Sequence, residues 1–116
     1  ENMEKTIRAH TTFLVTFAEK NPHYCHLLFD PESVRTRVHQ EMLQLLVDAH
    51  MARLRVGKDM GWIPVGLNLT VAAQAVVGML SQVLYWWIEH PEAATREEVI
   101  ETLTRLRTFG MRDRIE

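Results

Sequence analysis

The stretch LNLTVAAQAVVGMLSQVLYWWI, Leu67–Ile88, decides the fold of this chain. No charged residue occurs between Met60 and Ile88, and the stretch is apolar on nearly every helical face. It is long enough to cross a bilayer, but its Asn, Thr, Ser and Gln side chains would each need a partner in hydrocarbon. A central helix of a water-soluble bundle, buried on two sides, accounts for the pattern more simply. We therefore expect a helix over Asn68–Glu89 and no membrane span.

Proline, glycine and capping residues divide the rest of the chain into helical segments, with little sign of a strand. Asn21-Pro22 and Asp30-Pro31 each pair a capping side chain with a proline at the first helical position. His90-Pro91 ends the central helix, and Thr95-Arg-Glu-Glu98 is a capping box that opens the last one. The sequence therefore predicts five helices: Asn2–Lys20, His23–Phe29, a third that carries Val34 and stops at Gly57, Asn68–Glu89, and a last one from Thr95 to Gly110.

The composition is that of one ordinary globular domain. A length of 116 residues is enough for a single core, and 47% hydrophobic residues is far above the level of disordered chains. The net charge is −2 with no basic run, so these residues have no electrostatic footprint for nucleic acid. Cys25 is the sole cysteine, which excludes an internal disulfide and favours a reducing compartment. We expect residues 1–116 to form one domain in the cytoplasm.

The punctuating residues also form a recognisable order along the chain. They are Asn21-Pro22, Gly57, Gly61-Trp62-Ile63, Val77-Gly78, Trp86-Trp87, Pro91, Thr95-x-x-Glu98 and Leu106-x-x-Phe109-Gly110. In this order they resemble the C-terminal regulatory domain of TetR-type (tetracycline repressor family) transcriptional regulators. The resemblance implies an all-α five-helix bundle that binds a small-molecule effector, with its last two long helices forming a dimeric four-helix bundle. It also implies that DNA is contacted only through an N-terminal helix-turn-helix domain, which these residues do not contain.

Other functional classes find less support in the residues. No phosphate-binding glycine loop, nucleophile elbow or His-Glu-x-x-His motif occurs, so we expect neither an enzyme nor a cofactor. His39 and His50 lie three helical turns apart, about 16 Å, which is too far to share a metal ion. The alternative to an effector-binding repressor domain is a helical dimerisation adaptor without a ligand. A cavity of a few hundred Å³ as opposed to a packed core distinguishes the two.

Candidate ligand contacts are aromatic, methionine and histidine residues at helical spacing, together with polar Gln74 on the central helix. Core packing is the competing interpretation for each of them. Gln74 belongs to a stripe with Thr70, Gly78, Ser81 and Tyr85, which faces solvent, a symmetric helix or the polar wall of a cavity. The predicted ligand-binding residues are Phe13, Phe17, Tyr24, Met42, Leu46, His50, Trp62, Gln74 and Trp86.

The sequence pattern makes the central helix apolar on more faces than we expect a five-helix monomer of this size to cover. The last helix adds an apolar stripe of its own. Pairing both helices with a second copy would bury these surfaces in an isologous interface of more than ~1,200 Å². The predicted homodimer interface comprises Val76, Val77, Leu80, Val83, Leu84, Ile88, Val99, Leu103 and Leu106.

We predict that residues 1–116 alone give no sequence-specific DNA complex in an electrophoretic shift assay at moderate salt. The reason is the net charge of −2 and the absence of a basic recognition helix from the sequence. A specific complex formed by this chain alone would contradict the assignment of DNA contact to another domain.

Overall fold

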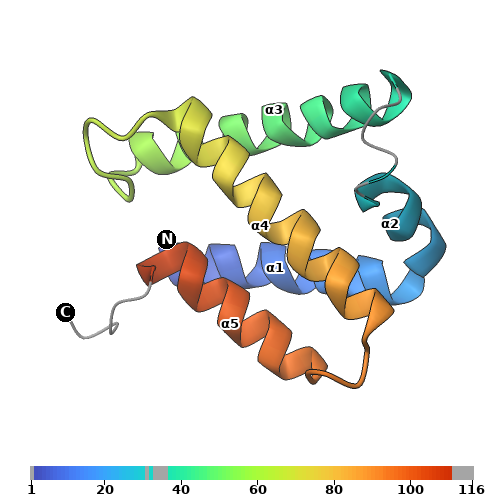
Figure 1. Ribbon diagram of the computed structural model, residues 1–116. Helices are drawn as coiled ribbons and strands as arrows, with labels where there is room; N and C mark the ends of the chain where they lie inside the picture. Colours follow the sequence, from blue (N-terminus) through green and yellow to red (C-terminus); the bar gives the residue numbers. More distant parts are fainter. Residues whose placement is uncertain (1, 31, 33–36, 111–116) are drawn as a thin grey trace.

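Five helices follow one another in the part of the chain that the structure, a computed structural model, describes: residues 2–30, 32 and 37–110. They are α1 (Met3–Lys20), α2 (Pro22–Phe29), α3 (Arg37–Asp59), α4 (Leu69–Glu89) and α5 (Arg96–Phe109) (Figure 1). These residues contain no strand, so the all-α prediction is confirmed. Val34, expected in the third helix, lies outside the described residues.

Side-chain caps begin three of the helices. Asn2 and Asn68 each accept a hydrogen bond from a backbone N–H three residues later, at 3.0 and 3.1 Å. The predicted capping box is present: the Thr95 hydroxyl accepts from the Glu98 N–H, and the Glu98 carboxylate accepts from the Thr95 N–H. Asn21 differs from its prediction, because its side chain donates to the Phe17 carbonyl and caps the end of α1.

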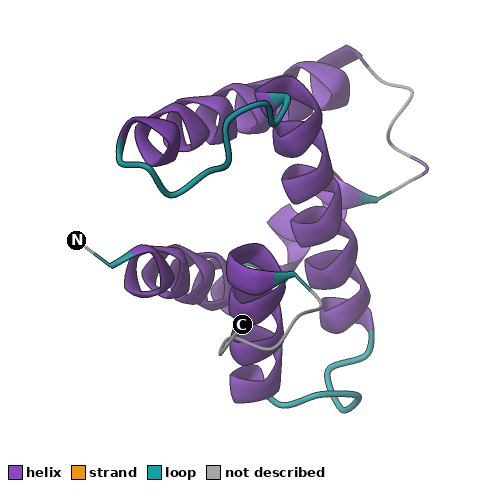
Figure 2. Cartoon of the chain, turned by 90° about the vertical axis from the view of Figure 1, so that its left-hand side faces the viewer, coloured by secondary structure: helices purple, strands orange, loops and turns teal. Residues whose placement is uncertain are grey.

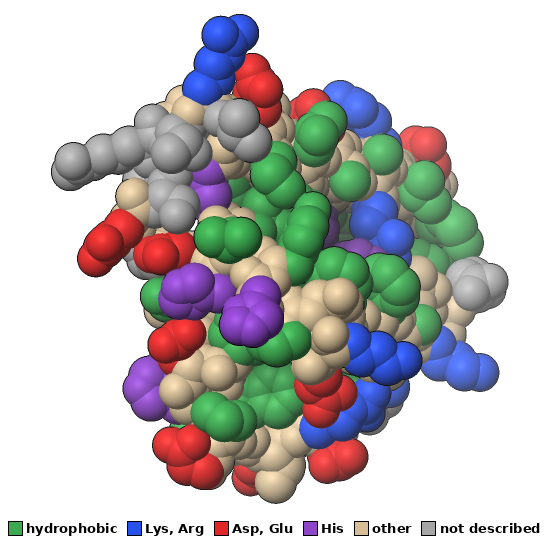
Figure 3. Space-filling model, turned by 90° about the vertical axis from the view of Figure 1, so that its right-hand side faces the viewer, with side chains coloured by type: hydrophobic (Ala, Val, Ile, Leu, Met, Phe, Trp, Pro, Cys, Tyr) green, Lys and Arg blue, Asp and Glu red, His purple; other side chains and the backbone are tan. Residues whose placement is uncertain are grey.

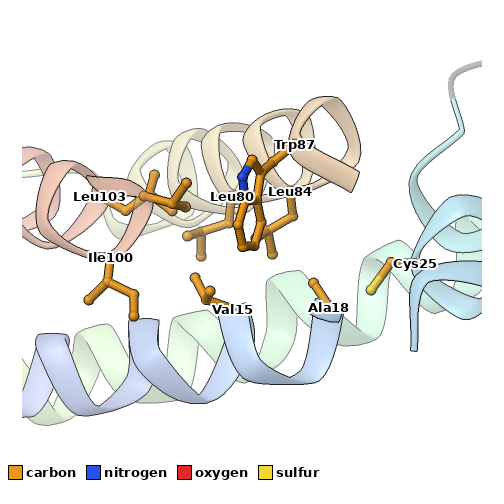
Figure 4. Close-up of a cluster of buried hydrophobic side chains, with 9 residues drawn as sticks. Val15, Ala18, Cys25, Leu80, Leu84, Trp87, Ile100 and Leu103 are labelled. Atoms are coloured by element: carbon orange, nitrogen blue, oxygen red, sulfur yellow. The ribbon is translucent and has the colours of Figure 1, made fainter. Parts of the chain in front are cut away.

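The larger of two hydrophobic cores lies between α1, α2, α4 and α5 (Figure 4). Its buried members are Val15, Ala18, Cys25, Leu80, Leu84, Trp87, Val99, Ile100 and Leu103. The indole of Trp87 lies among these aliphatic side chains, and its N–H donates to the Ala94 carbonyl at 2.9 Å. The polar edge of the tryptophan is therefore satisfied, and the same bond holds the turn before α5 against the end of α4.

The smaller core joins α3 to the first half of α4. Val47, Ala73 and Val77 are buried there, with Leu46, Met51 and Leu54 packed against them. Thus α4 is buried on two sides, against α3 near its start and against the larger core near its end (Figure 1). By length and composition α4 is the one described helix that could cross a membrane, and these two cores account for many of its apolar positions.

Polar bonds hold α5 alongside α1. Arg96 donates to the Thr16 hydroxyl at 2.6 Å and to the Glu19 carboxylate at 2.9 Å. Arg8 forms a 2.8 Å ion pair with Glu101 nearer the other end of α1. These exposed pairs each add little stability, so the buried residues between the helices supply most of it.

The short helix α2 packs against the second half of α4. Cys25 and Leu28 are buried, while His26 lies 3.0 Å from the Glu89 carboxylate and 3.6 Å from that of Asp30. Figure 3 shows this side of the molecule, where histidine and acidic side chains lie close together beside hydrophobic ones.

Five of the predicted dimer-interface residues lie inside these two cores, which corrects the prediction for them. They are Val77, Leu80, Leu84, Val99 and Leu103. Within one chain, α1 packs on the four residues of the larger core and α3 packs on Val77. The sequence pattern does not show how much of the apolar surface these two helices cover. Of the remaining interface candidates, Val76, Val83, Ile88 and Leu106 are half-buried.

We predict that Leu103→Ala destabilises the chain by about 2–5 kcal/mol, because it removes a side chain that is 2% exposed and leaves a cavity in the larger core. Leu45→Ala on α3 is the matched control, since Leu45 is 68% exposed, and its effect is expected to stay below about 1 kcal/mol. Urea unfolding followed by circular dichroism measures both. Equal destabilisation by the two substitutions would contradict the placement of Leu103.

Candidate ligand cavity

A cavity of about 500 Å³ lies between the two hydrophobic cores. It is bounded by the first turns of α1, the end of α3, the loop that follows α3, the start of α4 and the end of α5. Figure 2 views the molecule from this side, with the loop after α3 above the ends of α1 and α5. Its lining residues are Met3, Thr6, Ile7, His50, Arg53, Leu54, Val56, Gly57, Trp62, Ile63, Pro64, Leu67, Ala72, Val76, Arg107 and Thr108.

One face of α3 forms a wall of the cavity. His50, Leu54 and Gly57 follow one another at spacings of four and three residues, which places them on the same side of the helix. Arg53 lies beside this stripe and is exposed, so the cavity is open to solvent there.

The loop after α3 folds back onto the helix and closes a second wall. The Trp62 N–H donates to the Gly57 carbonyl at 2.9 Å, and a positive φ at Gly61 allows the tight turn between them. A Cβ atom at Gly57 would lie 3.1 Å from the Ile63 side chain. Gly57 therefore serves close packing inside the last turn of α3, which continues to Asp59 and does not stop at Gly57 as predicted.

Two histidines mark the inner part of this region. His50 is buried, and its Nδ1 lies 3.3 Å from the Leu46 carbonyl. Because a carbonyl only accepts, Nδ1 carries the proton and donates, while the buried Nε2 has no protein partner among the described residues. The His10 ring packs edge-on against His50, with centroids 5.3 Å apart.

Both rings are uncharged at neutral pH. Burial, and then repulsion by Arg53, Arg107 and His50, lower the pKa of His10 from 6.5 to about 3. Burial also lowers the pKa of His50, although its bond to the Leu46 carbonyl acts in the opposite direction. The positive charge at this wall therefore belongs to the two arginines.

Arg107 is a half-buried cation without a described acidic partner. Burial, and then repulsion by Arg53, lower its pKa from 12.5 to about 10, so it is still charged at pH 7. Its Nη1 donates to the Thr11 hydroxyl at 2.9 Å. Among the described residues no carboxylate forms an ion pair with Arg107 or Arg53. The arginines that do pair with glutamates lie elsewhere: Arg8, Arg37, Arg96 and Arg105.

The structure places two of the predicted ligand-binding residues, His50 and Trp62, in the lining of this cavity. Leu46 and Met42 are half-buried on α3 and lie outside the lining. The remaining candidates are exposed and lie away from the cavity, which corrects the prediction for Phe13, Phe17, Tyr24, Gln74 and Trp86.

The misplaced aromatic residues on α1 have a physical explanation. The inner face of α1 is formed by Thr11, Val15 and Ala18, whose small or branched side chains let α5 pack closely. Phe13 and Phe17 consequently point outward, where Phe17 packs edge-on against Tyr24 at 5.7 Å. Large apolar residues at helical spacing did not identify the buried face here.

Several lining residues were not among the predicted ones. Arg53 and Gly57 had a usable signal, since each follows His50 at a spacing that shares its helical face. Arg107 had none, because it lies on α5 and approaches Arg53 only through the tertiary fold. The helix α5 contributes to the cavity together with α1, α3 and α4.

Comparison with protein families, with curated proteins and with solved structures gives no match to this chain. Within residues 2–30, 32 and 37–110, no group of three or more His, Cys, Asp or Glu side chains could hold a metal ion. Any function assigned to the chain therefore depends on its own cavity and surfaces.

We predict that the free energy of unfolding falls as the pH is lowered from about 6.5 to about 3. The unfolded chain protonates His10 near its ordinary pKa of 6.5, whereas the folded chain does so only near 3. Between these values the unfolded state binds more protons, so each such histidine removes up to about 1.4 kcal/mol per pH unit. Above about pH 6.5 the His10 ring is neutral in both the folded and the unfolded chain, so it no longer lowers the free energy of unfolding.

Urea unfolding at a series of pH values measures this slope. His10→Asn is expected to flatten it, and His23→Asn, on the exposed surface of α2, is the matched control. An unchanged slope in His10→Asn would contradict a buried neutral His10.

Proposed function

We propose that this chain is the effector-binding and dimerisation domain of a TetR-like transcriptional repressor, acting in the cytoplasm. The cavity of about 500 Å³ is the observation that carries the proposal. Its volume lies within the range of sites for small organic molecules, and most of its lining is apolar. A dimerisation adaptor without a ligand would instead be expected to fill this space with side chains.

The position of the cavity suggests how an effector would act. Met3, Thr6 and Ile7, in the first two turns of α1, form part of its lining. A ligand that contacts them biases the direction in which α1 leaves the domain. In a regulator whose DNA-binding domain precedes α1, the ligand shifts the arrangement of that domain by as much as its affinities for the two arrangements differ.

The proposed homodimer is supported by an exposed stripe on α4. Val71, Ala75, Gly78, Gln82 and Trp86 recur at spacings of four and three residues, and all five are exposed. A Cβ atom at Gly78 would meet nothing within 4 Å, so a second helix has room to approach closely.

The exposed face of α5 is different in character. It carries charged residues, including Glu97, Glu101 and Arg105. Together with the burial of Val99 and Leu103, this directs the proposed contact mainly to the stripe on α4.

We predict that the chain sediments as a dimer at micromolar concentration and that Gly78→Glu shifts it to monomer. A charged side chain at the centre of the stripe would separate the two helices, and replacing a helical glycine does not weaken the monomer fold. Leu45→Glu on the exposed face of α3 is the control and is expected to remain dimeric. A monomeric unmutated chain, or a Gly78→Glu dimer, would contradict the α4 interface.

We also predict saturable binding of N-phenyl-1-naphthylamine, a neutral apolar fluorophore. Trp62→Ala is expected to weaken this binding by about tenfold or more, because it removes an aromatic wall of the cavity. Phe13→Ala, which truncates an exposed aromatic outside the cavity, should leave the affinity unchanged. If the fluorophore binds but Trp62→Ala has no effect on its affinity, the cavity is not its binding site and the adaptor alternative is favoured.

A further inference from the structure

The charge distribution in the cavity is one-sided. Among the described residues, Arg53 and Arg107 are the charged members of the lining, and no aspartate or glutamate takes part in it. The two arginines belong to different helices, α3 and α5, and both line this cavity, where their charges repel each other. An anion between them would be attracted by both and would relieve that repulsion.

The side chain of Arg107 lies in a half-buried position, where an unpaired positive charge lowers stability. Its guanidinium carries five N–H donors, and the Thr11 hydroxyl is its one hydrogen-bond acceptor among the described residues. A half-buried cation without an acidic partner loses part of its hydration, which a single hydroxyl does not fully replace. Arginine presents its donors in a planar fork that matches a carboxylate or a comparable acidic group.

His50 adds a polar side chain to the same wall. His50 is 93% buried, lines the cavity and leaves its Nε2 without a protein partner. Since Nδ1–H donates to the Leu46 carbonyl, Nε2 of the neutral ring keeps an unused acceptor lone pair, and this nitrogen is enclosed by protein atoms. The cavity lining therefore contains three polar side chains with unused hydrogen-bonding capacity, those of His50, Arg53 and Arg107.

The remainder of the cavity suits an apolar group. Trp62 and Ile63 close the wall formed by the loop, and Met3 and Ile7 line it from α1. A ligand with a polar end and an apolar body would match both parts of the lining.

We propose that the cavity binds an amphiphilic anion, an apolar body carrying a carboxylate or similar acidic group, whose charge is bound by Arg53 and Arg107. This inference rests on the proposed ligand-binding function and specifies the class of ligand. Aliphatic and aromatic acids share this chemistry.

Two fluorophores with the same apolar body test the role of charge. 8-Anilinonaphthalene-1-sulfonate differs from neutral N-phenyl-1-naphthylamine by one sulfonate group. The unmutated chain is expected to bind the anionic fluorophore more tightly. Arg53→Gln and Arg107→Gln should each weaken it by about tenfold or more, the range of a lost charge-assisted hydrogen bond, and leave the neutral fluorophore nearly unaffected.

Arg105→Gln is the matched control, because Arg105 lies on α5 outside the cavity and pairs with Glu101. It should change the affinity for neither fluorophore. Arg53 is exposed, so its substitution tests the charge without disturbing a buried contact, and the neutral fluorophore reports whether the cavity persists in Arg107→Gln.

The outcomes separate the two proposals. Equal affinity for both fluorophores, or arginine substitutions that weaken both alike, would overturn the anionic ligand class while leaving the ligand-binding function in place. Failure of both fluorophores to bind the unmutated chain would overturn the ligand-binding function itself.

Competition for the bound anionic fluorophore distinguishes the two kinds of acid. Octanoate represents aliphatic acids and 2-naphthoate aromatic ones, with octan-1-ol and 2-naphthol as their neutral counterparts. Stronger displacement by an acid than by its alcohol supports the proposal, and the more effective acid identifies the body that the cavity prefers. Alcohols that compete as well as the acids would overturn it.

Discussion

The structure depends on α4 packing against two separate groups of helices. Near its end, Leu80, Leu84 and Trp87 fill the core formed with α1, α2 and α5, whereas near its start Ala73 and Val77 pack against α3. No other described helix contributes to both cores, so α4 holds the two groups together. A cavity of about 500 Å³ lies where the start of α1 and the end of α5 face the end of α3. The cavity is thus a consequence of how one helix joins two packing layers.

The cavity contains features that cost stability in an isolated chain. Arg107 is a half-buried cation that has no described acidic partner, and His50 has a buried nitrogen with no described partner. Other polar groups of the described residues are paired: the Trp87 indole is hydrogen-bonded, and Arg96 pairs with Glu19. Unpaired polar groups at a cavity wall are typical of sites that are completed by a ligand.

The helix α4 also provides a physical link between the proposed ligand and the proposed partner subunit. Ala72 and Val76 line the cavity, while Val71 and Ala75, each one residue earlier, belong to the exposed stripe. A ligand and a second subunit would therefore contact different faces of the same turns of one helix. A small shift of α4 on ligand binding would be transmitted directly to the dimer contact, because packed helices move as rigid units.

The sequence by itself determined the helices, because their signals are local: capping side chains, prolines, and the uncharged run before Glu89 act within a few residues. It also placed His50 and Trp62 among the candidates that the structure finds at the cavity. Tertiary structure alone decided which faces are buried. Phe13 is exposed while Thr11 is buried, since close packing of α1 on α5 favours the smaller side chain there. It alone brought Arg107 to Arg53, because residues on different helices meet only once the cores have set how those helices cross.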